Sequence, residues 1–196
     1  MDQAGLIQDP EFFNEMESFG KSYRQGDLNV DEYSEFLLSP LLGKNLKELE
    51  DEIDIFTSDV IDRLTDELTE ELLLKHRDDT KILTSGSLTF LVKVIGQKMG
   101  IETCFGTDPE YKDNVFTGRV EGSPNFSEEK VRRIKIWMQS NHFEKIFAYS
   151  DSIHDLPLLE FSDIPSAISP DKKLLKVAEE RMWTVEGRRN ITRSLP

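Results

Sequence analysis

The sequence is poor in cysteine, histidine and basic side chains, and each shortage excludes a class of function. Cys104 is the single cysteine in 196 residues, so no disulfide can form within the chain. The histidines, His76, His142 and His154, stand among polar neighbours without zinc-site spacing, and we expect them to be solvated at the surface. Lysine and arginine number 24 against 38 aspartates and glutamates, and the resulting net charge of −14 would repel nucleic acid and anionic membranes. We therefore expect neither among the partners.

Long apolar runs are also absent. No segment is apolar enough over a sufficient length to cross a bilayer or to serve as a signal sequence. We therefore predict a soluble, cytoplasmic protein. Hydrophobic residues make up 37% of the chain, which allows one substantial core, or a core with a small accessory domain.

The pattern of apolar residues divides the chain in two. Residues 1–77 carry helical spacing and hardly any strand signal, which predicts a small helical bundle. In residues 78–196, short apolar strands alternate with helices, which predicts an α/β fold with a doubly wound, mostly parallel sheet. We expect strands at 82–83, 101–105, 146–149, 165–168 and 182–185, helices at 88–99 and 171–181, and a hairpin at 111–120 that turns at Asp113 and Asn114.

Two carboxylates follow the most apolar of these strands. The strand 146–149 is expected to be buried on both faces, and Asp151 and Asp155 come directly after it. Open α/β sheets bind ligands at the carboxyl ends of their strands, and two neighbouring carboxylates are unfavourable unless a cation or a lysine shares the site. The alternative is that Asp151 is a turn residue and that Asp155 caps a helix with Pro157 in its first turn.

Two other segments suggest an anion site. Thr84, Ser85, Gly86 and Ser87 form an expected loop before a helix, where backbone N–H groups and hydroxyls can bind an anion. The alternative is that Ser87 is an N-cap. Farther along, Ser127 is expected to cap a helix with Lys130 in its first turn. A cation there is disfavoured by roughly 0.3–1 kcal/mol, which suggests a lysine placed for another purpose.

In this order, Thr84 at a strand end, Lys130 at a helix start and the pair Asp151 and Asp155 resemble motifs two, three and four of the haloacid dehalogenase superfamily of phosphohydrolases. The segments ILTSGS, GSPNFSEEKV and YSDSIHDLPLL are similar to the phosphoserine-phosphatase-like subfamily IB, although His154 stands where that subfamily more often has asparagine. The resemblance implies a Rossmann-like core at 78–196 with an α-helical cap at 1–77.

The resemblance also implies a role for each matched residue. Thr84, Ser85, Gly86 and Lys130 would bind the substrate phosphate. Asp151 and Asp155 would form a Mg²⁺ site, Asp151 as the direct ligand and Asp155 as support for both the metal and the lysine. Lys130 and Asp155 would be the catalytic residues that remain, since phosphoryl transfer depends mainly on positioning and charge neutralisation.

The first motif of the superfamily has no match in the sequence. That motif is an apolar strand followed by D-x-D-x-T, and its first aspartate is the nucleophile. We therefore expect that the sequence is truncated at its start, that it lacks the first, central strand of the sheet, and that a partner strand or an oligomer fills the missing place.

These observations lead to two functional hypotheses. One is a Mg²⁺-dependent phosphomonoesterase of a small phosphorylated metabolite, inactive as this chain stands because the nucleophile is absent. Phosphoserine is the substrate that the subfamily name suggests, while histidinol phosphate and other small esters stay open. The other hypothesis is a non-catalytic remnant, such as a phosphate-binding or regulatory module.

Overall fold

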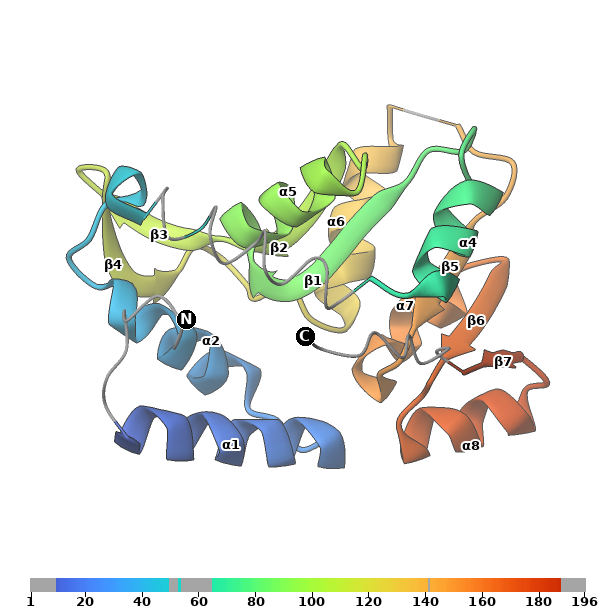
Figure 1. Cartoon of the computed structure of the whole chain (residues 1–196), viewed down its shortest axis with the longest axis horizontal. Coiled ribbons are helices and arrows are strands. Elements are labelled where there is room, and N and C mark those ends of the chain that lie inside the picture. The colour runs from blue at the N-terminus through green and yellow to red at the C-terminus, as the bar shows by residue number, and fades with distance from the viewer. Residues whose placement is uncertain (1–9, 50–52, 54–64, 141, 188–196) are drawn as a thin grey trace, which may run out of the picture.

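The computed structural model describes residues 10–49, 53, 65–140 and 142–187 (Figure 1). The helices are α1 (Pro10–Gln25), α2 (Val30–Leu38), α4 (Glu67–Lys75), α5 (Thr89–Lys98), α6 (Glu128–Met138), α7 (Leu156–Phe161) and α8 (Lys172–Glu180), with short 3-10 turns η2 (Ser39–Leu41), η3 (Leu46–Leu49) and η4 (Ile153–Asp155). The strands are β1 (Ile82–Leu88), β2 (Thr103–Thr107), β3 (Pro109–Lys112), β4 (Val115–Val120), β5 (Phe147–Ser150), β6 (Ile164–Ile168) and β7 (Thr184–Glu186).

The parallel strands form two sheets. β1 pairs with β2, and β5, β6 and β7 form a second parallel sheet, with helices between successive strands. This arrangement confirms the predicted α/β class. Within the described residues β1 pairs only with β2, and β5 only with β6, so the two parallel sheets share no strand pairing. Among the described residues, β1 and β5 are edge strands of the two sheets. Both strands line the cavity described in the next subsection.

β1 is longer than the sequence predicts. The expected loop at 84–87 is wrong, because these residues continue the strand from Ile82 to Leu88. Thr84 pairs with Phe105 and Leu88 with Thr107, and the register shifts between the two pairs. Pairing with β2 and a local irregularity thus override the loop preference of serine and glycine, as tertiary context often does in strands.

The hairpin prediction is confirmed. β3 and β4 are antiparallel, and Asp113 and Asn114 connect them with positive φ angles of 54° and 64°. Aspartate and asparagine tolerate this left-handed backbone, which a two-residue hairpin turn of type I′ requires. The hairpin lies beside α2 and η2 (Figure 1).

Two hydrophobic clusters hold these elements together. One lies among α6, α7, α8, β5 and β6, and includes Leu159, Ala167, Leu174 and Ala178, all fully buried. The other joins Leu38, Leu41 and Leu49 to Leu88, Leu91 and Phe116. Because the second cluster contains residues from both sides of position 77, the proposed division into a cap at 1–77 and a core at 78–196 stays a prediction.

Two histidines connect distant parts of the chain. His76, at the end of α4, has a side chain that is 12% exposed, and its Nε2 lies 2.7 Å from the Tyr149 hydroxyl on β5. The ring of His154 stacks on Tyr23 of α1, with ring centroids 4.8 Å apart. The prediction that all three histidines are solvated is therefore wrong for these two, because the elements that cover them come from distant segments. His142 is exposed.

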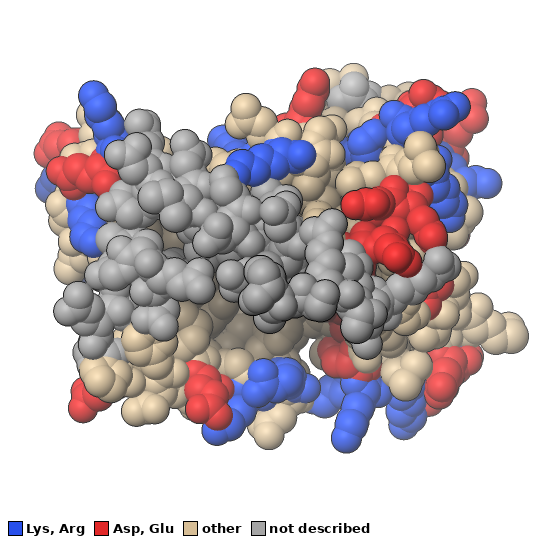
Figure 2. All heavy atoms as spheres, viewed as in Figure 1, with Lys and Arg blue, Asp and Glu red and all other residues tan. Residues whose placement is uncertain are grey.

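The face of the molecule shown in Figure 2 carries charge of both signs and no single dominant basic patch among its described residues. On the face shown in Figure 2, basic and acidic side chains alternate around the edge, and a group of acidic side chains lies over α4. In the part of the chain that the structure describes, no helix combines the length and apolar character needed to span a bilayer.

Candidate functional site

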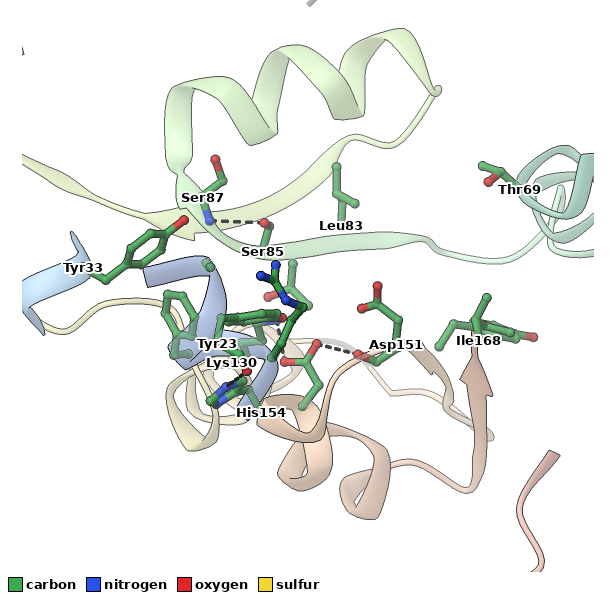
Figure 3. Close-up of a pocket in the computed structure, with 18 of the residues that line it drawn as sticks. Tyr23, Tyr33, Thr69, Leu83, Ser85, Ser87, Lys130, Asp151, His154 and Ile168 are labelled. Carbon is green, nitrogen blue, oxygen red and sulfur yellow. Dashed lines mark hydrogen bonds and ion pairs between the residues drawn. The ribbon is translucent and has the colours of Figure 1, made fainter. Parts of the chain in front are cut away.

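The six residues that were expected to bind phosphate or Mg²⁺ all line one cavity of about 730 Å³. They are Thr84, Ser85, Gly86, Lys130, Asp151 and Asp155. β1 supplies Thr84, Ser85 and Gly86. In Figure 3, Ser85 and Ser87 lie on one side of this cavity, and Lys130, Asp151 and His154 lie on the other. The cavity thus lies between the two parallel sheets, and the structure brings together residues that are up to 71 positions apart, from Thr84 to Asp155.

Lys130 and Asp155 form a nearly buried ion pair in this cavity. The Lys130 Nζ donates to Asp155 Oδ1 across 2.6 Å, and the two side chains are 8% and 14% exposed. The second oxygen, Oδ2, accepts a hydrogen bond of 2.7 Å from the Ser150 hydroxyl. This pairing accounts for a lysine in the first turn of α6, since a buried charge requires a hydrogen-bonded partner of opposite sign.

The two expected side-chain caps are absent. Asp155 and Ser127 stand at the N-cap positions of α7 and α6, but neither side chain makes a capping hydrogen bond. The Asp155 carboxylate is turned toward Lys130 and Ser150 instead. Ser127 has a φ of 48°, a backbone geometry unlike the extended one of an ordinary N-cap. The sequence therefore predicted that Asp155 and Ser127 stand at helix starts. It did not predict the direction of the Asp155 side chain, which is set by its contacts with Lys130 and Ser150.

Asp151 differs from Asp155 in having an uncommitted carboxylate. Asp151 is exposed, and its carboxylate makes no hydrogen bond or ion pair with the described residues, although its backbone oxygen accepts from the Asp171 N–H at 2.8 Å. Mg²⁺ is often bound through one or two carboxylates together with water and phosphate oxygens, which Asp151 fits. Both Asp155 oxygens are engaged, so Asp155 fits the predicted supporting role better than that of a direct ligand. Within the described ranges, no group of three or more histidine, cysteine or acidic side chains is placed to hold a metal.

The β1 side of the cavity has its own hydrogen-bond network. The Ser87 N–H donates to the Ser85 hydroxyl at 3.2 Å, and the Asn125 amide donates to the Thr84 hydroxyl at 3.0 Å. Ser87 does not cap α5, because Leu88 occupies that N-cap position without a side-chain bond. A Cβ atom at position 86 would overlap the Phe126 ring, so this close approach requires glycine.

Several cavity residues gave no signal in the sequence. Aromatic rings from α1, α2 and the segment before α6 line the cavity; they are Phe19, Tyr23, Tyr33 and Phe126. The Phe19 and Tyr33 ring centroids are 5.5 Å apart, and those of Tyr33 and Phe126 are 6.3 Å apart. Burial raises the pKa of the Tyr33 hydroxyl, so the hydroxyl stays protonated over a wider pH range. The helical spacing of Phe19 and Tyr33 in the sequence indicated only packing. No local pattern pointed to Asn125.

Comparisons with known proteins identify the family of the chain. The model of the haloacid dehalogenase-like hydrolase family matches residues 3–160. A histidinol-phosphatase of Neisseria meningitidis is 30% identical over 192 residues, which cover 93% of this chain and 86% of that protein. The phosphoserine phosphatase SerB1 of Mycobacterium tuberculosis is 29% identical over 136 residues, which cover 67% of this chain but only 44% of its own length.

Solved structures share the fold. A Bordetella pertussis protein of unknown function superposes with a TM-score of 0.82 at 30% identity, with 94% of this chain and 86% of that chain covered. A phosphoserine phosphatase described as a phospho-aspartyl intermediate analogue superposes with a TM-score of 0.65 at 20% identity, with 90% of this chain and 81% of that chain covered.

Proposed function

Because the chain belongs to the haloacid dehalogenase-like hydrolase family, we propose that its cavity binds the phosphate monoester of a small metabolite, as in a Mg²⁺-dependent phosphomonoesterase. The observation that carries this proposal is the convergence of Lys130, Asp151 and the β1 hydroxyls on one cavity. Phosphoryl transfer requires mainly the positioning and charge neutralisation of the transferred group. This cavity offers hydroxyl donors on one side and a buried ammonium group on the other.

Each residue has a defined part in this proposal. Thr84 and Ser85 donate hydrogen bonds to the phosphate oxygens, and Gly86 lets the backbone approach them. Lys130 neutralises charge on the phosphoryl group, while Asp155 fixes the position of the lysine through their ion pair. A Mg²⁺ ion held by Asp151 would supply further positive charge to the phosphate oxygens.

We propose that this chain alone binds such an ester without hydrolysing it. Asp155 is engaged by Lys130 and Ser150, and Asp151 is the proposed metal ligand, so neither is free to act as the nucleophile. A strand from a partner chain, paired with the edges of β1 and β5 that no described strand covers, would bring a carboxylate able to act as the nucleophile. Sheet edges bind extended segments through their unpaired N–H and C=O groups.

Without such a strand, the same cavity would act as a phosphate-binding module. An assay of p-nitrophenyl phosphate hydrolysis with Mg²⁺ distinguishes a chain that only binds phosphate from an active phosphatase. We expect the purified chain to bind inorganic phosphate and to show no turnover. Turnover that disappears in Asp151→Asn would disprove the inactivity and establish a phosphatase, whereas turnover that survives the substitution would indicate a contaminating enzyme.

The aromatic side chains bear on the organic part of the substrate. Phe19, Tyr33 and Phe126 present rings to the cavity, and such rings stack favourably on flat groups. We therefore propose that an ester with a planar ring, such as histidinol phosphate, binds more tightly than phosphoserine. Calorimetric titration with both esters tests this order, and tighter binding of phosphoserine would contradict it.

A further inference from the structure

Asn125 is a buried polar residue that the proposed phosphate site does not yet use. It is 0% exposed and lies between β4 and α6. Its side-chain Nδ2 lies 2.9 Å from the Ser85 carbonyl oxygen and 3.1 Å from the Phe105 carbonyl oxygen. The third neighbour of the same nitrogen is the Thr84 hydroxyl, at 3.0 Å.

These neighbours fix the orientation of the amide. Carbonyl oxygens can only accept hydrogen bonds, so the atom that faces Ser85 and Phe105 must be the NH₂ group and not the amide oxygen. The two N–H bonds of the Asn125 amide are shared among these three acceptors, and an amide nitrogen cannot accept, so the Thr84 oxygen is the acceptor in its contact with Asn125.

The direction of this hydrogen bond determines what Thr84 can do. A threonine hydroxyl carries a single proton, and none of the described residues accepts a hydrogen bond from the Thr84 hydroxyl. Since Thr84 lines the cavity, the O–H bond is available to point into it. The amide oxygen of Asn125 has no partner among the described residues, so the side chain is held through its donor end alone.

We propose that Asn125 is a positioning residue that commits the Thr84 hydroxyl to donate its proton to a phosphate oxygen in the cavity. This inference rests on the proposed function and adds a residue to it. Asn125 acts only through Thr84, and the substrate does not touch it. The class of ligand is an anion with a strong acceptor oxygen, for which inorganic phosphate is the simplest probe.

A double-mutant cycle on the full chain tests the inference, with inorganic phosphate titrated by calorimetry. We expect Thr84→Val to weaken phosphate binding by about tenfold or more, because a hydrogen bond to a charged group is lost. Asn125→Ala should weaken binding roughly 3- to 10-fold when residue 84 is threonine and leave it unchanged when residue 84 is valine. Thr84→Ser keeps the hydroxyl and should keep the affinity.

Thr107→Val is the matched control, since the Thr107 hydroxyl accepts from the Asn125 backbone N–H and donates to the Gly86 carbonyl in the same buried network. We expect it to lower the melting temperature while phosphate affinity stays within about twofold. An equal effect of Asn125→Ala in the threonine and valine backgrounds would reduce Asn125 to a structural role and overturn the inference alone. A wild-type chain that binds no phosphate would overturn the proposed function, and this inference with it.

Discussion

Lys130 and Asp155 are joined by a hydrogen-bonded ion pair of 2.6 Å that connects the first turn of α6 to the turn after β5. The two elements belong to the same hydrophobic cluster, and the pair holds the Lys130 ammonium group at the wall of the cavity beside its Asp155 counter-charge. A single contact therefore contributes both to the folded state and to the position of the ammonium group in the proposed phosphate site.

Replacement of Lys130 by methionine should destabilise the protein strongly. The substitution leaves the Asp155 carboxylate nearly buried without its cation, and breaking such a pair costs about 3–5 kcal/mol of unfolding free energy. Urea unfolding measures the loss. Lys145→Met, at an exposed lysine, is the control and should change stability by less than about 0.5 kcal/mol. A comparably small change in Lys130→Met would show that the ion pair is not a structural contact.

Asp151→Asn should affect only the response to Mg²⁺, whereas Asp155→Asn should lower stability even without metal. The Asp151 carboxylate makes no hydrogen bond or ion pair with the described residues, so its replacement should leave the melting temperature in metal-free buffer unchanged and abolish any rise caused by Mg²⁺ with phosphate. Asp155→Asn removes the partner of Lys130 and should lower the melting temperature even without metal. A Mg²⁺ response that survives Asp151→Asn would assign the metal to other residues.

Gly86→Ala should weaken phosphate binding without unfolding the protein. The added methyl group overlaps the Phe126 ring, which must move within the cavity that both residues line. We expect phosphate affinity to fall by about fivefold or more, which corresponds to the lower end of the usual overpacking cost of about 1–3 kcal/mol falling on the phosphate-bound state. Gly187→Ala is the control, because a Cβ there meets no atom within 4 Å. Unchanged affinity in Gly86→Ala would exclude close approach of phosphate to this segment.

Tyr33 should make stability dependent on alkaline pH. Burial raises the pKa of its hydroxyl above the ordinary value of 10.0, so the unfolded chain releases this proton at a lower pH than the folded chain. Stability from this group is complete below pH 10.0 and is lost as the pH rises through the folded pKa. Tyr33→Phe keeps the ring and should make the fall in urea midpoint above that pH less steep. An unchanged slope would contradict the predicted contribution of Tyr33.

The open edges of β1 and β5 predict a pattern of amide hydrogen exchange. Backbone N–H groups on the unpaired edges should exchange faster than those paired with β2 and β6, because no strand in the described part of the chain pairs with them. Binding of the proposed partner strand should slow exchange at β1 and β5 together. Slow exchange at both edges in the isolated monomer would mean that these amides are already protected and would leave no place for a partner strand.

The sequence predicted the parts of the site that follow from chain order. Asp151 directly follows β5 of a parallel α/β fold, and ligands bind at the carboxyl ends of such strands. Thr84 lies within β1 and not at its end, although it still lines the cavity. The unfavourable position of Lys130 at a helix start suggested another purpose for it, and the family resemblance gave its expected role at the phosphate. In each case a local pattern carried the information.

The remainder of the site depended on long-range packing. Asn125 looks like an ordinary loop residue. Only the folded chain brings its amide beside Ser85 and Thr84, which are 40 and 41 positions away in the sequence. The extension of β1 through Ser85 depended on pairing with β2. His76 was misjudged for the same reason, because Tyr149 is 73 positions away.

The division of the parallel strands into two sheets has a consequence for how the protein unfolds. The β1–β2 sheet and the β5–β6–β7 sheet share no strand pairing in the described part of the chain and are joined by side-chain packing, with Ile82 and Phe105 against the cluster of β5 and β6, so we expect one ladder to open locally before the other. A phosphate bound between Thr84 and Lys130 would act as a non-covalent bridge across the two units. Ligand binding would then merge two overlapping melting steps into a single cooperative transition.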